Sequence, residues 1–156
     1  MEKTNAMRLL DKAGIKYETK EYEYDENDLS GLTVAKKIGL DPDMVFKTIA
    51  AVGDKTGVIL MCVPASFEIN LKKAAVASSN KKVEPLHVSD LLKTVGYIRG
   101  GCTPIGTKKK FPVFFDESIL LFDKITISAG VRGCQLYLSS KELIEFTQAT
   151  VCDIGQ

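Results

Sequence analysis

Lys47, in the run Val45-Phe46-Lys47-Thr48, is the residue whose type and surroundings most clearly offer chemistry. Side chains alternate along a strand, so a strand that begins at Phe46 places Lys47 on the same face as Ile49 and Ala51. An ammonium group on an apolar face must be paired or functional, because burying it alone is expensive. It could donate to a carbonyl or phosphate oxygen. A lysine at a strand end can also reach back to water, and the pattern alone leaves both interpretations open.

A second cluster runs from Gly96 to Gly106 and contains the adjacent glycines Gly100 and Gly101, followed by Pro104. Two adjacent glycines let the backbone approach a ligand closely. Their N–H groups could form a donor pair for an oxyanion or a phosphate. An ordinary turn rich in glycine and proline has the same composition, and the spacing alone favours that interpretation.

The third cluster is a glycine-flanked turn, Ser128-Ala129-Gly130-Val131-Arg132-Gly133, with a serine and an arginine near its ends. It offers either an anion site or a simple hairpin turn. Lys108, Lys109 and Lys110 directly follow the glycine loop, where they could hold a phosphate backbone beside a pocket. The net charge of +1 indicates that any contact with nucleic acid is confined to one local face.

Several common catalytic arrangements are missing. The sequence has no G-x-S-x-G elbow, P-loop, G-x-G-x-x-G or H-E-x-x-H motif. His87 is the only histidine, and its position between Leu86 and Val88 favours a structural role over that of a catalytic base. The four cysteines form no C-x-x-C pair, so we expect no metal site and no cofactor.

The composition is that of an ordinary globular protein, with 45% hydrophobic and 26% charged residues, and predicts one domain over residues 1–156. The polar start Met1-Glu2-Lys3-Thr4 does not resemble a secretory signal, and no apolar run reaches the length of a membrane span. We therefore expect a cytoplasmic protein with reduced cysteines and no membrane contact.

Interleaved helices and strands must position these clusters. Helices are predicted over 88–92 and after the capping residues Thr4, Ser30 or Thr33, Asn70 and Ser139. Strands are predicted at residues 15–24, 46–52, 57–63, 97–99, 113–115, 125–128 and 135–138. A hairpin joins the second strand to the third, whose wholly apolar sequence belongs at the centre of a sheet. The fold class is therefore α/β of the α+β type, with a mixed or antiparallel sheet.

Taken together, the three clusters resemble the YbaK/EbsC family, the Cys-tRNA(Pro) deacylases of the wider prolyl-tRNA editing domain superfamily. The order and spacing of the clusters match, and the stretches 21–25 and 35–40 extend the similarity over nearly the whole chain. The resemblance implies a mixed sheet, strongly curved or barrel-like, with flanking helices around one pocket. It also implies hydrolysis of a wrong amino acid from tRNA.

The resemblance assigns roles to individual residues. The family's essential lysine corresponds to Lys47, which with Gly101 makes up the predicted catalytic pair. Lys108, Lys109 and Lys110 are the predicted contacts to the tRNA backbone. The predicted substrate-binding residues are Tyr22, Thr48, Gly100, Thr103, Pro104, Ser128, Gly130, Arg132 and Gln135.

Two departures from the family pattern bear on the preferred amino acid. Gln135 stands where close relatives carry an aspartate, and many relatives carry an aromatic residue near the position of Ser30. In the cysteine-specific members, the substrate's own thiol is thought to cyclise onto its ester, while the protein supplies orientation and electrostatics. Lys47 would then hold the 3′-terminal nucleotide or the ester region as a fixed positive charge. Gly101 would orient the aminoacyl group through its backbone.

The leading hypothesis is an aminoacyl-tRNA deacylase that acts in trans on mischarged tRNA(Pro), with Cys-tRNA(Pro) as its expected substrate. Prolyl-tRNA synthetase is a candidate second partner. A preference for Ala-tRNA(Pro) is a variant of this hypothesis. The competing hypothesis is a non-catalytic module that binds tRNA ends, nucleotides or a synthetase, and it is motivated by the missing nucleophile, the near-neutral charge and Gln135.

Overall fold

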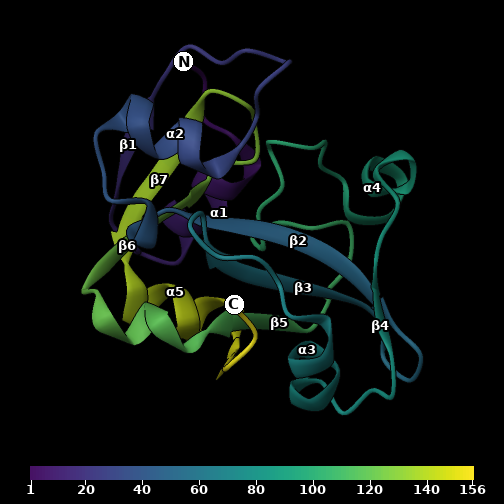
Figure 1. Ribbon diagram of the computed structural model, residues 1–156. Helices are drawn as coiled ribbons and strands as arrows, with labels where there is room; N and C mark the ends of the chain where they lie inside the picture. The colour runs from purple at the N-terminus through teal and green to yellow at the C-terminus, as the bar shows by residue number, and fades with distance from the viewer.

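Two open sheets and five helices make up the fold in the computed structural model, which describes residues 1–156 (Figure 1). The smaller sheet has the strand order β1-β7-β6, from β1 (Tyr17–Glu21), β7 (Cys134–Ser139) and β6 (Lys124–Ser128). The larger sheet has the order β4-β2-β3-β5-β8. Its strands are β2 (Phe46–Gly53), β3 (Gly57–Pro64), β4 (Val83–Pro85), β5 (Val113–Asp116) and β8 (Thr150–Cys152).

The larger sheet is mixed, as predicted. β2 and β3 form the expected antiparallel hairpin, whereas β3 pairs with β5, and β5 with β8, in parallel. β3 lies third of five strands and is buried from Ile59 to Pro64, which confirms its predicted central position. Both sheets have free edges, so the barrel-like form implied by the family resemblance is not confirmed.

The helices begin where their capping residues predict. Side chains of Thr4, Ser30, Asn70 and Ser139 each accept a backbone N–H of the first turn. The helices are α1 (Asn5–Lys12), α2 (Gly31–Ile38), α3 (Leu71–Ala77), α4 (Val88–Val95) and α5 (Ser140–Thr147). Two 3-10 helices, η1 (Pro42–Met44) and η2 (Glu117–Leu121), complete the set. α4 alone starts without a side-chain cap, at His87, which is an exposed residue rather than a buried structural histidine.

Three apolar clusters occupy the two sides of the sheets. The main core draws on both sheets, with Phe46, Leu60, Phe115, Ile125 and Leu136 among its members. A second cluster lies on the other side of the larger sheet, where α3 covers Ala51, Ile59 and Met61. A third joins α2 to the segments before β2 and after β3, through Val34, Ala35, Val45 and Ala65. The elements that meet around Val45 therefore have a core of their own.

A single parallel bridge connects the two sheets, between Val45, immediately before β2, and Thr126 in β6. In the smaller sheet, Thr126 in turn lies opposite Tyr137, and Ser128 lies opposite Gln135. Lys47 is two residues beyond Val45, as Ser128 is two residues beyond Thr126. The start of β2 and the end of β6 therefore run side by side in the same direction.

A clasp made by residues 154–156 holds the segment that follows β3. Glu68 and Gln156 exchange two backbone hydrogen bonds of 2.9 Å, and Ile69 bridges Gly155. The buried Asp116 carboxylate accepts the N–H groups of Ile154 and Gly155 at 3.2 and 3.0 Å. The clasp fixes Glu68, whose side chain reaches toward the start of β2.

Two strand predictions need correction, and two strands were missed. Residues 97–99 are not a strand, because Tyr97 packs under the glycine loop rather than pairing with a neighbour. The strand expected over residues 15–24 is shorter, since regular pairing with β7 extends only from Tyr17 to Glu21. β4 and β8 were not predicted. Each is three residues long and exists only through its pairing with β2 or β5.

Candidate active site

Lys47 lies second in β2, directly opposite Val63 of β3. Phe46 and Ala50 enter the main core and Ala51 enters the cluster beneath α3, which confirms the predicted alternation. The Lys47 side chain is 27% exposed, and its Nζ lies 3.8 Å from Oε1 of Glu68, whose own side chain is 80% exposed. The ammonium group therefore fits neither the fully buried nor the fully solvent-exposed lysine that the sequence allowed. It is largely covered but reaches solvent, and its long ion pair leaves it able to take another anionic partner.

Polar side chains continue from Lys47 across the smaller sheet. Ile125, Ile127 and Leu136 point into the main core, so strand alternation sends Thr126, Ser128 and Gln135 to the opposite face. The register of the Val45–Thr126 bridge sets Lys47 and Ser128 at the same level on that face. The stripe of Lys47, Ser128, Gln135 and Thr126 therefore crosses three adjacent strands, and we refer to it as the polar stripe.

Two oxygens of the polar stripe are buried without a hydrogen-bond partner. Gln135 is 5% exposed, and its Oε1 accepts no hydrogen bond. Thr126 is fully buried, and its Oγ1 likewise has no partner. Buried polar groups are nearly always paired, so these two atoms are candidates for receiving a ligand or a water molecule. Sequence reasoning missed Thr126, although its alternation with Ile125 and Ile127 could have placed it on this face.

Tyr22 closes one end of the polar stripe, just beyond β1. Its backbone N–H donates to the Gly133 carbonyl at 3.0 Å, and its ring packs against the cluster that contains Val45. Burial raises the pKa of the Tyr22 phenol, and the neighbouring Gly133 backbone and Gln135 side chain only partly offset that effect. The phenol is therefore a neutral hydrogen-bonding group at physiological pH, and it lies next to Gln135. Its contact with a substrate remains a prediction.

The glycine loop and the Ser128–Gly133 turn pack against each other. A Cβ atom added to Gly101 would lie 3.2 Å from Cα of Val131, so only glycine fits this contact without displacement. Arg132 Nε donates to the Arg99 carbonyl at 2.9 Å, and Gly100, at φ +87°, lies against Arg132 and Leu29. These contacts bring the second and third sequence clusters together.

The two backbone amides of the glycine loop do not form the donor pair that we considered. The Gly101 N–H donates to the Ile98 carbonyl at 2.9 Å within the loop. A backbone contact from Gly101 to a ligand would therefore come from its carbonyl. Tyr97 supports the loop from below, with its hydroxyl donating to the Ile105 carbonyl at 2.5 Å.

The Ser128 side chain is engaged within its own turn. Its Oγ accepts the Gly130 N–H at 3.1 Å, and Gly130 has a left-handed φ of +97°. A Cβ atom on Gly130 would lie 3.0 Å from the Tyr97 ring, so this glycine allows the turn to sit on the glycine loop. Ser128 and Gly130 are therefore positioned together, as expected of a Ser-x-Gly turn.

Three predicted substrate-binding residues are engaged or buried within the fold. Thr48 projects to the opposite face of β2 from Lys47, and its Oγ1 lies 3.5 Å from Sγ of Cys62. Thr103 and Pro104 are buried within the glycine loop, and Thr103 Oγ1 has no hydrogen-bond partner. Contact of these three residues with a substrate remains a prediction.

Lys108, Lys109 and Lys110 are exposed, and their ammonium groups contact only neutral groups. Lys108 Nζ donates to the Lys93 carbonyl at 3.3 Å, Lys109 lies over the Phe111 ring, and Lys110 donates to Gln148. Because no carboxylate pairs with them, their charges remain available to phosphate groups.

No side chain near the polar stripe is an activated nucleophile. Burial raises the pKa of both the Cys62 and the Cys102 thiol to about 12, so neither is a thiolate at neutral pH. All four cysteines are unpaired. No group of three or more His, Cys, Asp or Glu side chains is arranged to hold a metal ion. A reaction here must take its attacking group from the substrate or from water.

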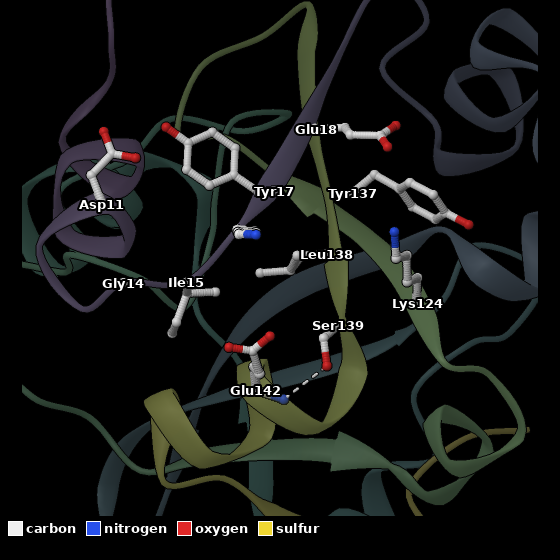
Figure 2. Close-up of a pocket in the computed structure, with 11 residues that line it drawn as sticks. Asp11, Gly14, Ile15, Tyr17, Glu18, Lys124, Tyr137, Leu138, Ser139 and Glu142 are labelled. Carbon is white, nitrogen blue, oxygen red and sulfur yellow. Dashed lines mark hydrogen bonds between the residues drawn. The ribbon is translucent and has the colours of Figure 1, made fainter.

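A surface hollow of about 880 Å³ lies between α1, β1, β7 and the start of α5 (Figure 2). Asp11, Glu18, Lys124 and Glu142 give its wall charges of both signs, and Tyr137 stands between Lys20 and Lys124, whose Nζ atoms are each 5.4 Å from its ring centre. It contains none of the predicted site residues. Its residue Tyr137 lies opposite Thr126 of the polar stripe, so the hollow adjoins the stripe on the same face of the smaller sheet.

Comparison with known proteins defines the class. Residues 31–146 match the aminoacyl-tRNA editing domain, and the chain belongs to that family. It is 42% identical over 153 residues to the proposed Cys-tRNA(Pro)/Cys-tRNA(Cys) deacylase EbsC of Enterococcus faecalis, covering 98% of this chain and 93% of that protein. It is 27% identical to the uncharacterized protein YwhH of Bacillus subtilis, over 85% of each chain.

Solved structures share the fold. A proposed trans-editing enzyme for prolyl tRNA synthetase superimposes with a TM-score of 0.85 at 21% identity, covering 100% of this chain and 99% of that one. The hypothetical protein APE2540 gives a TM-score of 0.86 at 19% identity, covering 96% and 97%. At these identities the likeness shows a common fold. No helix in the structure is long and apolar enough to cross a membrane.

Proposed function

We propose that this protein is an aminoacyl-tRNA deacylase that acts in trans as a single domain, with Cys-tRNA(Pro) as its principal substrate. The observation that carries the proposal is the polar stripe. A half-covered lysine adjoins buried oxygens that have no partner, and no protein nucleophile lies nearby. Such a site can hold and polarise an ester but cannot attack it. The relationship to EbsC, whose name specifies Cys-tRNA(Pro) and Cys-tRNA(Cys), supports this choice of substrate.

The proposed reaction uses the thiol of the substrate. The cysteinyl sulfur bonds to its own carbonyl carbon, the ester C–O bond breaks, and the thiol proton passes to the released ribose oxygen. Water then opens the resulting thiolactone to free cysteine. Lys47 would stabilise the negative charge that develops on the carbonyl oxygen or hold the terminal phosphate. The neutral acceptor Gln135 Oε1 and the Tyr22 phenol would orient the aminoacyl group.

The decisive experiment measures deacylation of Cys-tRNA(Pro), Ala-tRNA(Pro) and correctly charged Pro-tRNA(Pro) by wild type and by Lys47→Ala. We expect hydrolysis of Cys-tRNA(Pro), and a loss of roughly 100-fold or more in Lys47→Ala, the scale seen when one stabilising charge is removed from an active site. Equal rates for the two proteins would refute the role of Lys47. Comparable activity on Ala-tRNA(Pro), which has no thiol, would exclude the substrate-assisted step and indicate an attacking water.

A non-catalytic binding module is the second candidate, favoured by the engaged Gly101 N–H and by an amide rather than a carboxylate at Gln135. It predicts salt-dependent binding of tRNA(Pro) without turnover of any aminoacyl-tRNA. Prolyl-tRNA synthetase is a proposed additional partner of the deacylase. Addition of the synthetase should then raise the rate of deacylation at limiting tRNA.

A further inference from the structure

A groove between α3, β4 and the start of α4 lies outside the candidate active site. Its volume is about 810 Å³, and it is lined by Leu71, Lys72, Ala75, Lys81, Lys82, Val83, Glu84, Pro85, Leu86, His87 and Val88. The elements that line it meet at the edge of the larger sheet formed by β4, and α4 follows β4 in the chain (Figure 1). Nothing in the proposed reaction requires this groove.

The groove has an apolar floor that continues onto an exposed helix face. Leu71 is 38% exposed and Val88 is 62% exposed. Leu92, one turn after Val88 on the same side of α4, is 55% exposed. Apolar residues spaced in this way on a helix normally face a core. Here they face solvent beside a groove, as in surfaces that bind another polypeptide.

The rim of the groove is positively charged. Lys72 and Lys81 take part in no ion pair, and the only carboxylate in the lining, Glu84, is paired with Lys82 at 2.8 Å. Nearby Asp54 accepts the backbone N–H groups of Lys81 and Lys82, and Asp90 pairs with Lys93. Two unpaired ammonium groups therefore flank the apolar floor and complement an acidic partner.

The residues that line the groove favour a peptide ligand over a nucleic acid. His87 is the only aromatic side chain in the lining, which has no Phe, Tyr, Trp or Arg, so the groove offers one surface for a base to stack on. Leucine, valine, alanine and proline on the floor instead match the apolar face of an amphipathic helix.

We propose that this groove docks an acidic amphipathic helix of a partner protein. Its apolar residues would cover Leu71, Val88 and Leu92, and its carboxylates would meet Lys72 and Lys81. β4 pairs with Ala51 to Gly53 at the far end of β2 from Lys47, and strand geometry separates Lys47 from Val52 by about 16 Å. A partner can therefore occupy the groove while tRNA occupies the polar stripe.

The test uses a fluorescein-labelled 18-residue helical probe with leucines at i, i+3, i+4 and i+7 and glutamates at its other positions. Fluorescence polarisation should show saturable binding to the intact protein, and amide shifts should map to α3, β4 and α4. The same leucine stripe with lysines in place of glutamates should not bind. We expect the double variant Lys72→Glu/Lys81→Glu and the single variant Val88→Glu each to weaken binding about tenfold or more. All three positions are exposed, so folding should survive.

A charge-matched control, Lys12→Glu/Lys16→Glu, changes two exposed lysines outside the groove and should bind the probe as wild type does. Equal binding of the lysine probe, or equal loss in the control, would overturn the proposal. So would concentration-dependent self-association that Val88→Glu abolishes, because the groove would then be a dimer contact. Deacylation is a separate readout. If Lys72→Glu/Lys81→Glu lowers it and flattens its salt dependence, the groove binds tRNA instead of protein.

Discussion

Two buried side-chain amides, Asn80 and Gln135, show how differently this molecule treats similar groups. Asn80 Oδ1 accepts the N–H groups of Lys55 and Thr56 at 2.9 and 3.1 Å, and its Nδ2 donates to Thr56 Oγ1 and Ser78 Oγ at 3.0 and 2.7 Å. Gln135 is buried to a similar degree, 5% against 8% exposed, yet its Oε1 has no partner.

The contrast is between an amide whose hydrogen bonds are all made within the fold and an amide whose oxygen is left without a partner. Asn80 holds the turn between β2 and β3 and leaves no bonding capacity unused, so it stabilises the fold. Gln135 retains an unused acceptor on the sheet face that also carries Lys47, with Ser128 on the strand between them. An unsatisfied acceptor costs stability unless another molecule supplies a donor. The turn of the β2–β3 hairpin is therefore held by a fully hydrogen-bonded amide, whereas the amide oxygen in the polar stripe is left unpaired.

The largest expected effect is on the satisfied amide. Asn80→Ala removes four hydrogen bonds, so we expect the free energy of unfolding to fall by about 3 kcal/mol, measured by urea denaturation. Asn27→Ala, at an exposed position, should change it by less than about 0.5 kcal/mol. If the free energy of unfolding changes by a similarly small amount in both variants, Asn80 does not stabilise the fold and does not differ from Gln135 in this respect.

The converse result is expected for Gln135→Leu. Stability should stay within about 0.5 kcal/mol of wild type or rise, because an unsatisfied acceptor is replaced by an apolar group of similar size. kcat/KM for Cys-tRNA(Pro) should fall roughly tenfold, as for the loss of one substrate hydrogen bond. Loss of stability with unchanged kcat/KM would show that Gln135 is a structural residue like Asn80.

A smaller effect concerns pH, at the active-site end of the same hairpin. Burial raises the pKa of Cys62 from 9.0 to about 12, so the folded protein keeps a proton that the unfolded chain loses. The contribution of this thiol to stability should therefore be constant below about pH 9 and decline between pH 9 and 12. We expect the free energy of unfolding of wild type to fall by about 1 kcal/mol more than that of Cys62→Ala between pH 8 and pH 10. If the free energy of unfolding falls equally in wild type and Cys62→Ala, the titrating group is a residue other than Cys62.

Much of the fold could be predicted from local patterns in the sequence. Capping residues located four helices, and the apolar run of β3 located the centre of the larger sheet. The alternation around Lys47 was also predictable, because it depends only on strand geometry. β4 and β8 were not, since three residues carry little intrinsic preference and these strands form only against β2 and β5.

The sequence predicted which residues gather at the candidate site better than it predicted which hydrogen bonds they make. Lys47, Ser128, Gln135 and Tyr22 come together, but the unpaired oxygen of Thr126 depends on the Val45–Thr126 bridge, which joins strands far apart in the sequence. The engagement of the Gly101 N–H likewise depends on how the loop closes onto Ile98. Such pairings are decided by tertiary contacts, which local patterns do not encode.

The clasp formed by residues 154–156 has a consequence for folding order. Asn70 and Gln156, which hydrogen bond through their side chains, are 86 positions apart. Closing so long a loop costs entropy that must be offset by contacts already formed, so the clasp belongs to the late stages of folding. Glu68, the carboxylate nearest Lys47, is held by that clasp. We therefore expect the ion pair between Lys47 and Glu68 to form only after the clasp has closed.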